Sequence, residues 1–514
     1  MANSNLFTKT PVMTPNRSGF SLSHEHLTTM PVGTLVPFCW EMMPNTDISL
    51  GALANVELPP FATDFNGKID LRLEAFFVPC RQLWLGFKDF ITRQNLFEQG
   101  ASFPTVVPRY LVNSSRLSIV QNANIPTLED YLGMHSATQD YVSALPFLAY
   151  HKVFQDWYQD RRVQKALFVP SDIQANSLAN LPFTRGNSSI VFNGQESFYN
   201  GSKLYDLHQR NYDRDFFTTA QLTATAGNDE AVEIVDDAFT ISALRQANAL
   251  QRFSEILGQV GNDYGRYMKA MYGKYPSAEK TQRAIYLGSA RQRLYSAGID
   301  QSISSEQGAD MELRNPFSKQ LGGSAGQIGT TMESSLVGKF TTDEHGYLLV
   351  MASIVPIAFY SNLKNLDLFH LYHADFANQK FAGMGNVPIK SSMLSPSGVG
   401  TFGWTDRYSE YKFKNSVVSG AFREAGWLQY FSLKRHFTGS PQLNSSFLEI
   451  PQTALDEVLA VTEEGRDYPV NFARLNIGFK FNVVQPLPVY SIPTLEDHQH
   501  GQHVQMVQKA GTHI

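Results

Sequence analysis

The stretch ALPFLAYHKVFQDWYQDRRVQ, from Ala144 to Gln164, predicts an amphipathic helix around which the rest of the chain is organised. Its apolar and aromatic residues recur in steps of three, four and three, which places them on one face: Phe147, Tyr150, Phe154 and Trp157. The polar residues predicted to face outward are Asp156, Gln159 and Asp160. Ser143 is the predicted N-cap, and Pro146 fits only the first turn. Arg161 and Arg162 lie at the carboxyl end, where cations suit the helix dipole.

The same stretch resembles the ALPFRAYN…EWFRD segment of the major capsid proteins of microviruses, the small tailless single-stranded DNA bacteriophages, and most closely the gokushovirus-like branch. Similar blocks recur in the family's order and span most of the chain: residues 17–40 (RSGFSLSHEHLTTMPVGTLVPFCW), 65–91, 242–272, 403–423 (GWTDRYSEYKFKNSVVSGAFR) and 471–489. The resemblance does not extend over residues 175–235 and 275–330.

Length and composition favour one large unit. The chain has 514 residues, and its hydrophobic residues (43 %) and aromatic residues (12 %) are spread evenly, without a long linker rich in Pro, Ser or Gly. All-β folds with large insertions reach this length as one unit, so residues 1–514 are predicted to form a single domain. Charged residues make up only 17 %, below the quarter that is usual in soluble proteins. We therefore expect part of the exterior to be covered by partners.

The charge balance argues against strong autonomous binding of nucleic acid. The net charge is -5, from 42 basic and 47 acidic residues, and the longest basic runs are pairs such as Lys434-Arg435. Strong binding needs a basic patch or arm that displaces counterions from phosphates. The resemblance implies that a separate small basic DNA-binding protein neutralises the packaged DNA.

The sequence indicates neither secretion nor a membrane span. Residues 1–19 are polar and contain no apolar signal segment. The most apolar run, Tyr347 to Tyr360, is too short to cross a bilayer and is predicted to be a buried strand or a bent strand pair. The two cysteines, Cys39 and Cys80, are expected to be small buried hydrophobic residues in a reducing cytoplasm.

Alternating residues predict strands near both ends of the chain. Lys68 to Pro79 places apolar residues on one face and Asp70, Arg72 and Glu74 on the other, the pattern of a strand with one wet face. Leu475 to Val483 alternates strictly. Further strands are predicted over residues 346–359 and 408–423, and helices over residues 81–98, 242–272 and 451–464.

Early strands, a broad middle excursion and late strands predict a mainly β sandwich whose first and last parts pair across the sequence. The resemblance makes this specific, because it implies an eight-stranded antiparallel jelly roll of the viral capsid type with long, partly helical insertions. It also implies that residues 184–339, from Thr184 to Lys339, form an insertion outside the barrel that projects from the shell. Residues 1–19 and 486–514 are predicted to be extended terminal arms across neighbouring copies, because alone they cannot bury a core.

Histidine patterns are the first candidates for a metal site. His24-Glu25-His26 places two histidines on one face of a strand, like the start of a cupin site. The glutamate of such a site is missing, since Met30 and Pro31 stand at the required positions. The expected role of both histidines is packing or hydrogen bonding at a subunit contact.

The remaining motifs predict no metal, no cofactor and no catalytic residue. His370 and His373 lack a third ligand, and the polar tail at residues 496–503 has no fixed geometry, so it is expected to bind no metal or only adventitious metal. The glycines from Gly323 to Gly329 form neither a dinucleotide fingerprint nor a Walker loop, and no GxSxG elbow occurs. We therefore predict that the chain is not an enzyme.

Two stretches combine aromatic residues with cations, Tyr408 to Lys414 and Trp157 to Lys165. Such a composition suits the stacking of bases while Lys and Arg meet phosphate. A packed core with a solvated edge explains the same composition, so the residues that contact DNA remain unassigned.

These features predict a major capsid protein that is assembled in the bacterial host cytoplasm and located in the virion. The resemblance implies a T=1 icosahedral shell of sixty copies around circular single-stranded DNA, with a minor or pilot protein as a further partner. The insertion is the expected site of contact with a host surface receptor. The alternatives are a lectin-like or spike β-sandwich that binds carbohydrate as a small oligomer, and a metal-dependent cupin-type enzyme that uses His24 or His26.

Overall fold

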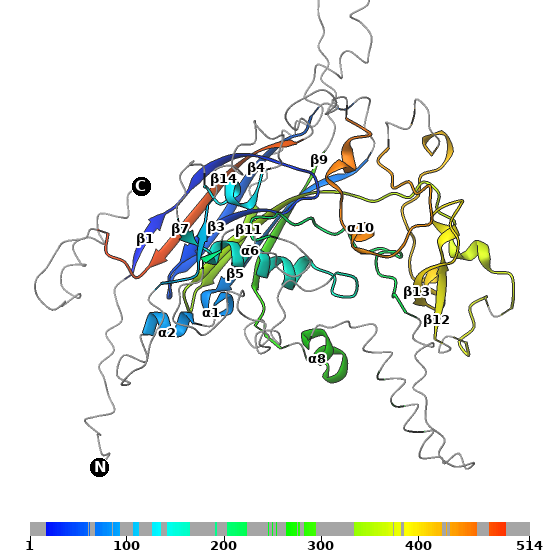
Figure 1. The fold of residues 1–514 in the computed structure, drawn as a ribbon, viewed down its shortest axis with the longest axis horizontal. Helices are drawn as coiled ribbons and strands as arrows, with labels where there is room; N and C mark the ends of the chain where they lie inside the picture. The colour runs from blue at the N-terminus through cyan, green and yellow to red at the C-terminus, as the bar shows by residue number, and fades with distance from the viewer. Residues whose placement is uncertain are drawn as a thin grey trace, which may run out of the picture.

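Two antiparallel sheets packed face to face form the centre of the molecule (Figure 1). The computed structural model describes residues 17–59, 61, 67–84, 86–92, 106–112, 126–134, 141–164, 191–192, 203–223, 245, 249, 253, 264–274, 276–277, 282–294, 334–373, 375–381, 385–423, 428, 432–459 and 472–489. The first sheet contains β1 (Ser18–Ser21), β2 (His24–Met30), β14 (Ala473–Gln485), β4 (Asp47–Glu57) and β10 (Ser334–Thr341). The second has the order β3 (Val36–Met42), β11 (Gly346–Pro356), β5 (Ile69–Pro79) and β9 (Ile285–Leu294).

The strand order is that of a jelly roll. β1 and β2 pair with successive parts of β14, since Phe20 lies opposite Val483 and His26 lies opposite Ile477. Counted as one interrupted edge strand, they make each sheet four strands wide, and strands that follow each other in sequence mostly alternate between the two sheets. The predicted mainly β, antiparallel fold class is therefore confirmed. The count of eight strands stays a prediction, because it depends on how this divided edge is counted.

Apolar side chains that alternate along the strands fill the space between the sheets. β14 buries every second side chain: Leu475, Ile477, Phe479, Phe481 and Val483. β11 is buried along its whole length. One face of β11 meets the core between the sheets through Val350, and the other meets a second apolar cluster through Leu349. The alternation in the sequence therefore predicts β14 correctly, and the unbroken apolar run predicts β11 correctly.

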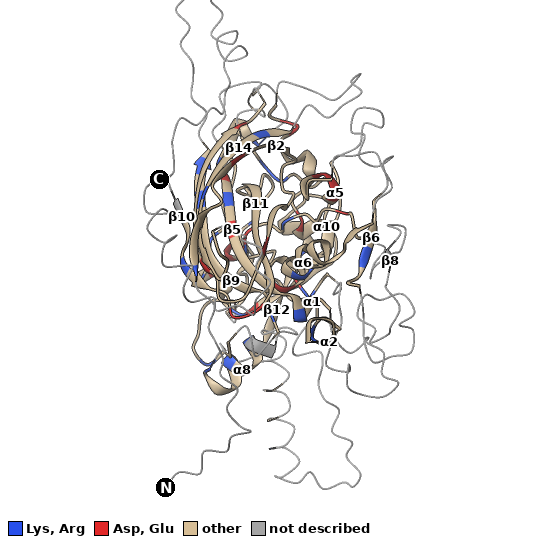
Figure 2. Cartoon of the chain, turned by 90° about the vertical axis from the view of Figure 1, so that its left-hand side faces the viewer, with Lys and Arg blue, Asp and Glu red and all other residues tan. Residues whose placement is uncertain are grey.

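Short helices cover the outer face of the second sheet (Figure 2). The helices in this part of the chain are α1 (Cys80–Leu83), α2 (Phe87–Thr92), α5 (Leu128–Tyr131), α6 (Leu145–Val153), the π-helical turn η2 (Phe154–Tyr158) and α8 (Tyr264–Tyr272). A small sheet has the order β7 (Tyr141–Ser143), β6 (Arg109–Leu111) and β8 (Val191–Phe192). The helix predicted over residues 81–98 is therefore two short helices in the described part of that range. α8 covers the end of the helix predicted over residues 242–272, most of which lies outside the described residues.

α6 begins one residue after the predicted start. The backbone N–H of Leu145 donates to Ser143 Oγ at 3.3 Å, and Pro146 lies in the first turn. Phe147 and Tyr150 are fully buried under the second sheet. The N-cap residue is Ala144 and its side chain does not cap the helix, so the prediction of Ser143 as the N-cap is wrong by one residue, whereas Pro146 and the buried apolar side chains lie as expected.

The end of the helix differs from the prediction because the chain widens into the π-helical turn η2. Trp157 keeps 40 % of its surface exposed, whereas Asp156 is buried. The Asp156 carboxylate accepts from the backbone N–H of Ala284 at 2.9 Å and pairs with Lys152 Nζ at 2.9 Å. The prediction that Asp156 faces outward is wrong, because η2 turns it toward these two partners.

The face of β5 that the sequence predicts to be exposed to water is also largely buried, and its carboxylates pair with arginines. Asp70 is fully buried, and its carboxylate accepts from Arg293 Nε at 3.1 Å. Glu74 accepts from Arg210 Nη1 at 2.6 Å. Both cations come from distant parts of the sequence, which is why the pattern within residues 68–79 indicated water on this face instead of ion pairs.

Two barrel strands lie inside residues 184–339, the range predicted to be an insertion outside the barrel. β9 pairs with β5, with Gln292 opposite Leu71, and β10 pairs with β4, with Phe340 opposite Ile48. The predicted boundaries are therefore wrong for β9 and for most of β10, because these strands complete the two sheets. Residues 224–244 and 295–333 lie outside the described residues, and their projection from the barrel stays a prediction.

A third cluster lies beside the barrel at the right of Figure 1. Most of its residues lie between β11 and β14 in sequence, and Phe216, Phe217 and Ala220 join them from the segment before β9. Its elements are η7 (Leu366–Phe369), β12 (Asn386–Lys390), η8 (Ser391–Met393), β13 (Thr401–Asp406), η9 (Ser409–Tyr411), η10 (Gly420–Phe422), α10 (Ser445–Leu448) and η12 (Gln452–Leu455). The strand predicted over residues 408–423 is wrong, because Tyr408 has a left-handed backbone (φ 63°) and short 3-10 turns follow it. The helix predicted over residues 451–464 appears as η12, with Leu455 buried.

Little of the predicted terminal arms falls within the described residues. Residues 18–19 belong to β1, and residues 486–489 follow β14. Residues 1–16 and 490–514 lie outside the described part of the chain.

Candidate functional site

A polar cavity of about 430 Å³ lies where η2, residues 210–219 and the segment before β9 meet. Its charged wall consists of six arginines and three aspartates: Arg161, Arg162, Arg210, Arg214, Arg266 and Arg283, with Asp156, Asp160 and Asp213. Cations thus outnumber carboxylates by three in the lining. An excess of guanidinium groups around a concave space suits an anionic ligand.

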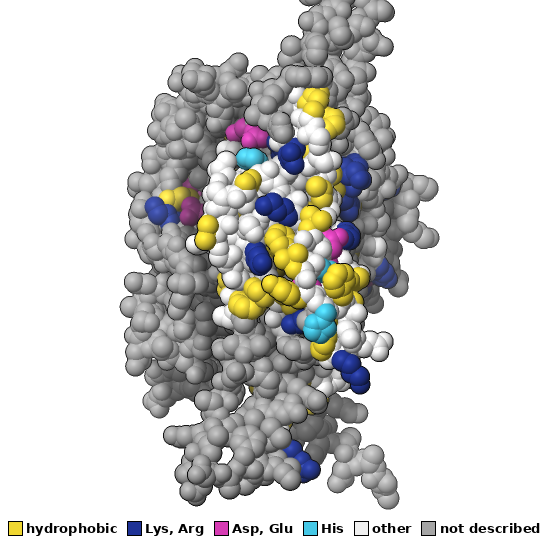
Figure 3. Space-filling view, turned by 90° about the vertical axis from the view of Figure 1, so that its right-hand side faces the viewer, with side chains coloured by type: hydrophobic (Ala, Val, Ile, Leu, Met, Phe, Trp, Pro, Cys, Tyr) yellow, Lys and Arg dark blue, Asp and Glu magenta, His cyan; other side chains and the backbone are white. Residues whose placement is uncertain are grey.

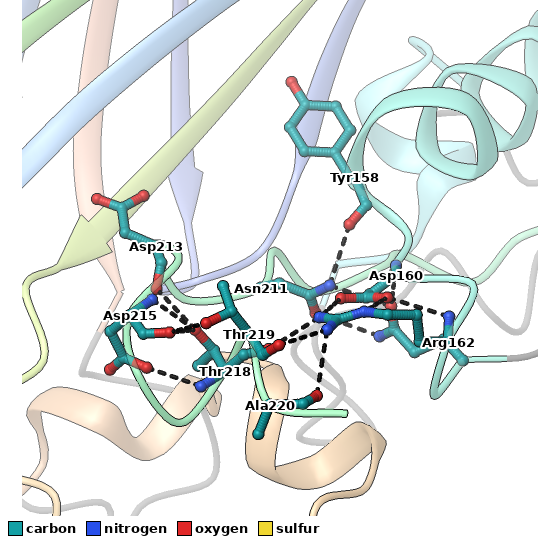
Figure 4. Close-up of polar contacts among 10 residues, drawn as sticks. Tyr158, Asp160, Arg162, Asn211, Asp213, Asp215, Thr218, Thr219 and Ala220 are labelled. Carbon is teal, nitrogen blue, oxygen red and sulfur yellow. Dashed lines mark hydrogen bonds and ion pairs between the residues drawn. The ribbon is translucent and has the colours of Figure 1, made fainter. Parts of the chain in front are cut away.

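Arg162 fixes one wall of this cavity (Figure 4). Its Nη2 and Nε donate to the two oxygens of the Asp160 carboxylate at 2.6 and 3.0 Å. Its other N–H groups donate to the backbone carbonyls of Thr218, Thr219 and Ala220 at 2.7 to 3.1 Å. Because all five donors are occupied, Arg162 ties these segments together and has none left for a ligand.

Asp160 stays ionised in this arrangement. Burial acts to raise the pKa of its carboxyl, but the Arg162 guanidinium outweighs burial and holds the pKa below the ordinary value. Asn211 Nδ2 donates to the carbonyl oxygen of Tyr158 at 3.0 Å, which joins the end of η2 to the neighbouring wall. The cavity is therefore held by polar contacts within the chain.

Asp215 stabilises the turn whose backbone carbonyl oxygens, at residues 218–220, accept hydrogen bonds from Arg162. Its Oδ1 accepts from the backbone N–H groups of Thr218 at 2.7 Å and Phe217 at 3.0 Å, and its backbone carbonyl accepts from Thr219 Oγ1 at 2.6 Å. The Tyr360 hydroxyl donates to the other carboxylate oxygen. The turn thus has its shape fixed from both sides.

Arg210 faces the barrel and is bound to it by three hydrogen bonds. It binds both oxygens of Glu74, at 2.6 and 3.1 Å, and donates to Ser353 Oγ at 3.0 Å. Burial acts to raise the pKa of Glu74, but the charge of Arg210 and their hydrogen bonds lower it below the ordinary value. This pair joins residues 203–223 to the outer face of β5.

Arg161 and Arg214 differ from these two structural arginines. Arg161 Nη2 lies 3.8 Å from Asp156 Oδ1, too far for a hydrogen bond. No carboxylate in the described part of the chain forms an ion pair with Arg214. Partial removal from water, followed by the positive charge of Arg266, lowers the pKa of Arg214. An anion placed here would offset this crowding of cations.

Trp157 brings an aromatic surface to the same cavity. Its Nε1 donates to the carbonyl oxygen of Ala284 at 2.9 Å, and the Arg283 guanidinium lies 4.4 Å from the ring centroid. The sequence identified the aromatic and basic residues between Trp157 and Lys165 as one of two such stretches. It gave no signal for residues 210–219 or for Arg283, because the fold alone brings them to this place.

Of the predicted histidine pair, His24 is exposed and His26 is half-buried, and both contact aromatic rings. The His24 ring centroid lies 5.7 Å from that of Trp40 and 5.4 Å from that of Phe479, and the His26 centroid lies 4.9 Å from that of Phe38. Among the residues that the structure describes, no group of three or more His, Cys, Asp or Glu side chains forms a metal site.

The other predicted motifs add no chemistry to the described residues. His370 Nε2 lies 3.1 Å from Glu410 Oε1, and His373 contacts an aromatic ring at 5.7 Å. The polar tail at 496–503 and the glycines at 323–329 lie outside the described residues.

The thiols and the helices give no further site. Cys39 and Cys80 are free, and burial raises the pKa of each thiol to about 12, which keeps the reactive thiolate scarce at neutral pH. Within the described ranges, no helix has the length and apolar character that a membrane span requires.

An exposed apolar region forms a second candidate site on the cluster beside the barrel (Figure 3). We call it the aromatic surface, and it consists of Leu368, Leu371, Tyr372, Phe376, Tyr411 and Phe413. The His370 ring links its two halves, with centroids 5.6 Å from that of Phe376 and 6.2 Å from that of Tyr411. Large apolar side chains exposed together in this way mark a contact surface.

Comparisons with known proteins give one consistent result. Residues 9–238 and 226–495 match the family described as Capsid protein (F protein). The chain is 23 % identical to "Capsid protein VP1" of Chlamydia phage 1, covering 96 % of this chain and 98 % of that protein. It is 25 % identical to "Capsid protein VP1" of Bdellovibrio phage phiMH2K, with 96 % and 98 % covered. The protein of the same name from Spiroplasma virus 4 is 22 % identical, with 93 % and 95 % covered.

Proposed function

The chain belongs to the capsid protein (F protein) family, and from this premise we propose that sixty copies close into a T=1 icosahedral shell around a circular single-stranded DNA genome. As a major capsid protein it is a structural component of the virion and not an enzyme. A closed shell of identical chains requires heterologous contacts, in which one surface of a copy meets a different surface of its neighbour.

The observation that best supports this proposal is the aromatic surface. Leu371 and Tyr372 expose 76 % and 73 % of their surfaces, and Leu368 exposes 71 %. Burying such side chains stabilises an association by about 25 cal/mol for each Å² of apolar area. In a chain with only 17 % charged residues, this surface is suited to lie against a second copy.

Further contacts follow from the same proposal. Residues 1–16 and 490–514 would lie across neighbouring copies, and the parts of residues 184–339 outside β9 and β10 would meet a host surface receptor. A small basic DNA-binding protein and a minor or pilot protein would complete the particle. Exchange of residues 224–244 and 295–333 between related phages is expected to change host range, and an unchanged range in every exchange would contradict the receptor role.

The contact is tested by Leu371→Asp, with Leu371→Met as the matched control. Leu371 is largely exposed in the single chain, so neither change should alter folding, which circular dichroism would verify. Sedimentation and electron microscopy should show shells of about 3.5 MDa for the wild type and the control, given a chain of 57.6 kDa. Leu371→Asp should remain a small species. Normal shells from Leu371→Asp would exclude this surface as a contact, and a wild type that never forms spherical particles would refute the shell itself.

A further inference from the structure

Shell formation leaves the arginine-lined cavity without a role. Two of its arginines bind carboxylates of the chain, Arg162 through Asp160 and Arg210 through Glu74. Of the other four, Arg283 Nη2 donates to the carbonyl oxygen of Asp156, and neither Arg161 nor Arg214 has a carboxylate of the described residues within hydrogen-bond distance. Like charges gathered in one concave space are unfavourable unless an anion joins them.

The size and the lining of the cavity indicate which anion fits. Its volume of about 430 Å³ exceeds what a small inorganic ion fills and lies within the range of ligand pockets, ~300–1,000 Å³. Guanidinium groups match the oxygens of phosphate in a two-point geometry. Trp157 lies next to them with 40 % of its surface exposed, although its ring already contacts Arg283, Phe76 and Tyr286. A base can stack on the part of the ring that remains exposed.

We propose that this cavity binds a nucleotide unit of single-stranded nucleic acid, with Arg161 and Arg214 as ligands of the phosphate and Trp157 as the stacking surface for the base. The inference rests on the proposed function, because the enclosed genome supplies the strand.

A single local site agrees with the overall charge of the chain. A net charge of -5 and the lack of a basic arm in the sequence exclude strong binding along many phosphates. One cavity that takes one or two phosphates predicts weak binding with a shallow dependence on salt, about 0.7 in the logarithmic slope for each phosphate of a single strand. Sixty such sites in a shell would hold the strand at regular positions.

The first experiment measures binding by the purified full-length chain. Fluorescence anisotropy follows a labelled twelve-residue oligothymidine over a range of salt concentrations, with the double variant Arg161→Gln/Arg214→Gln beside wild type. Arg474→Gln is the matched control, because the Arg474 side chain lies on the barrel with 65 % of its surface exposed. The double variant should bind at least tenfold more weakly with a shallower salt slope, and the control should behave as wild type. Equal affinity and slope in the double variant and the control would overturn the inference.

The second experiment separates a nucleic acid strand from free phosphate. Inorganic phosphate would compete for the same arginines in either case, so an abasic strand of twelve residues is compared with the oligothymidine instead. Equal affinity for the two would show that the cavity takes phosphate alone, and this result would overturn the inference. Ultraviolet cross-linking of intact virions, followed by mass spectrometry, should place nucleotides on the peptide that contains Trp157. Normal, DNA-filled shells without any cross-link on that peptide would refute the cavity site alone, whereas the absence of shells would refute the proposed function.

Discussion

A buried histidine pair determines how this chain should respond to acid. His151 Nδ1, on α6, lies 2.7 Å from Nε2 of His208, and His151 Nε2 lies 2.9 Å from the carbonyl oxygen of Leu204. A carbonyl only accepts, so His151 carries its proton on Nε2, and its Nδ1 accepts from His208 Nε2–H. The His208 ring is stacked 4.0 Å from the Phe154 ring. Burial favours the neutral form of both histidines by lowering the pKa of each ring.

The structure sets the direction and the size of the effect. Burial lowers the pKa of His151 to about 4 and the pKa of His208 well below its ordinary value. In the unfolded chain both rings titrate near ~6.5, so below that pH the unfolded state binds more protons than the folded state. Stability is therefore complete above pH 6.5 and falls as the pH drops toward 4. For His151 alone the loss at pH 5 is about 2 kcal/mol, and His208 adds to it in the same direction.

The assay is urea unfolding of the full-length chain at pH 7 and pH 5, for wild type and His151→Gln. A glutamine amide can donate to the Leu204 carbonyl and accept from His208, but it does not titrate. Most carboxylates remain ionised at pH 5, so the comparison isolates the histidine. Wild type should lose about 2 kcal/mol more than the variant between the two pH values. Equal losses would show that His151 is not held neutral by burial and would refute the reasoning.

Three further changes test the barrel and its ion pairs, each by denaturant unfolding. Phe479→Ala should cost about 3–5 kcal/mol, since this side chain is 2 % exposed between the sheets, and a loss below 1 kcal/mol would contradict the packing. Glu74→Gln should cost about 3 kcal/mol because it leaves Arg210 without its carboxylate, and an unchanged midpoint would mean that the pair is not buried. Gly33→Ala should cost at least about 2 kcal/mol, because Gly33 has φ +74° and an added Cβ would lie 2.6 Å from Ile450 Cγ2; full stability would contradict that close contact.

The parts of the fold that the sequence predicts correctly are those whose surroundings repeat along one segment. β14 alternates between the core and water, so its own pattern is sufficient to identify it. The start of α6 is also indicated locally, because Pro146 lies in its first turn. β5 has the same alternation as β14, yet its polar face is covered. The arginines that neutralise Asp70 and Glu74 are more than a hundred residues away in sequence, so no local pattern records them.

For residues 408–423 the sequence pattern fails in the opposite way, because side chains predicted to be buried are exposed. Alternating aromatic residues and lysines predict a strand with one buried face, but Tyr411 and Phe413 are 61 % and 40 % exposed. Their alternation is matched by no sheet among the described residues, and the left-handed Tyr408 begins a series of turns. If the aromatic surface is an interface, the burial that the pattern indicates takes place only in the assembled shell. The pattern then records contacts between copies that a single chain does not make.

The arginine-lined cavity could not be predicted from the sequence for two reasons, the distance of its segments in sequence and the averaging of charge over the whole chain. The longest contiguous part of its lining runs from Gln155 to Arg162, and the remaining wall comes from residues 210–219, Arg266, Arg283 and Leu448. The net charge of -5 averages over the whole chain and therefore conceals a local excess of three positive charges. The net charge of the whole chain limits how strongly it can bind a polyanion, but it does not determine which part of the chain binds it. If the proposed shell of sixty copies encloses one continuous strand, a weak site needs little affinity in each copy, because each bound segment raises the effective concentration of the next.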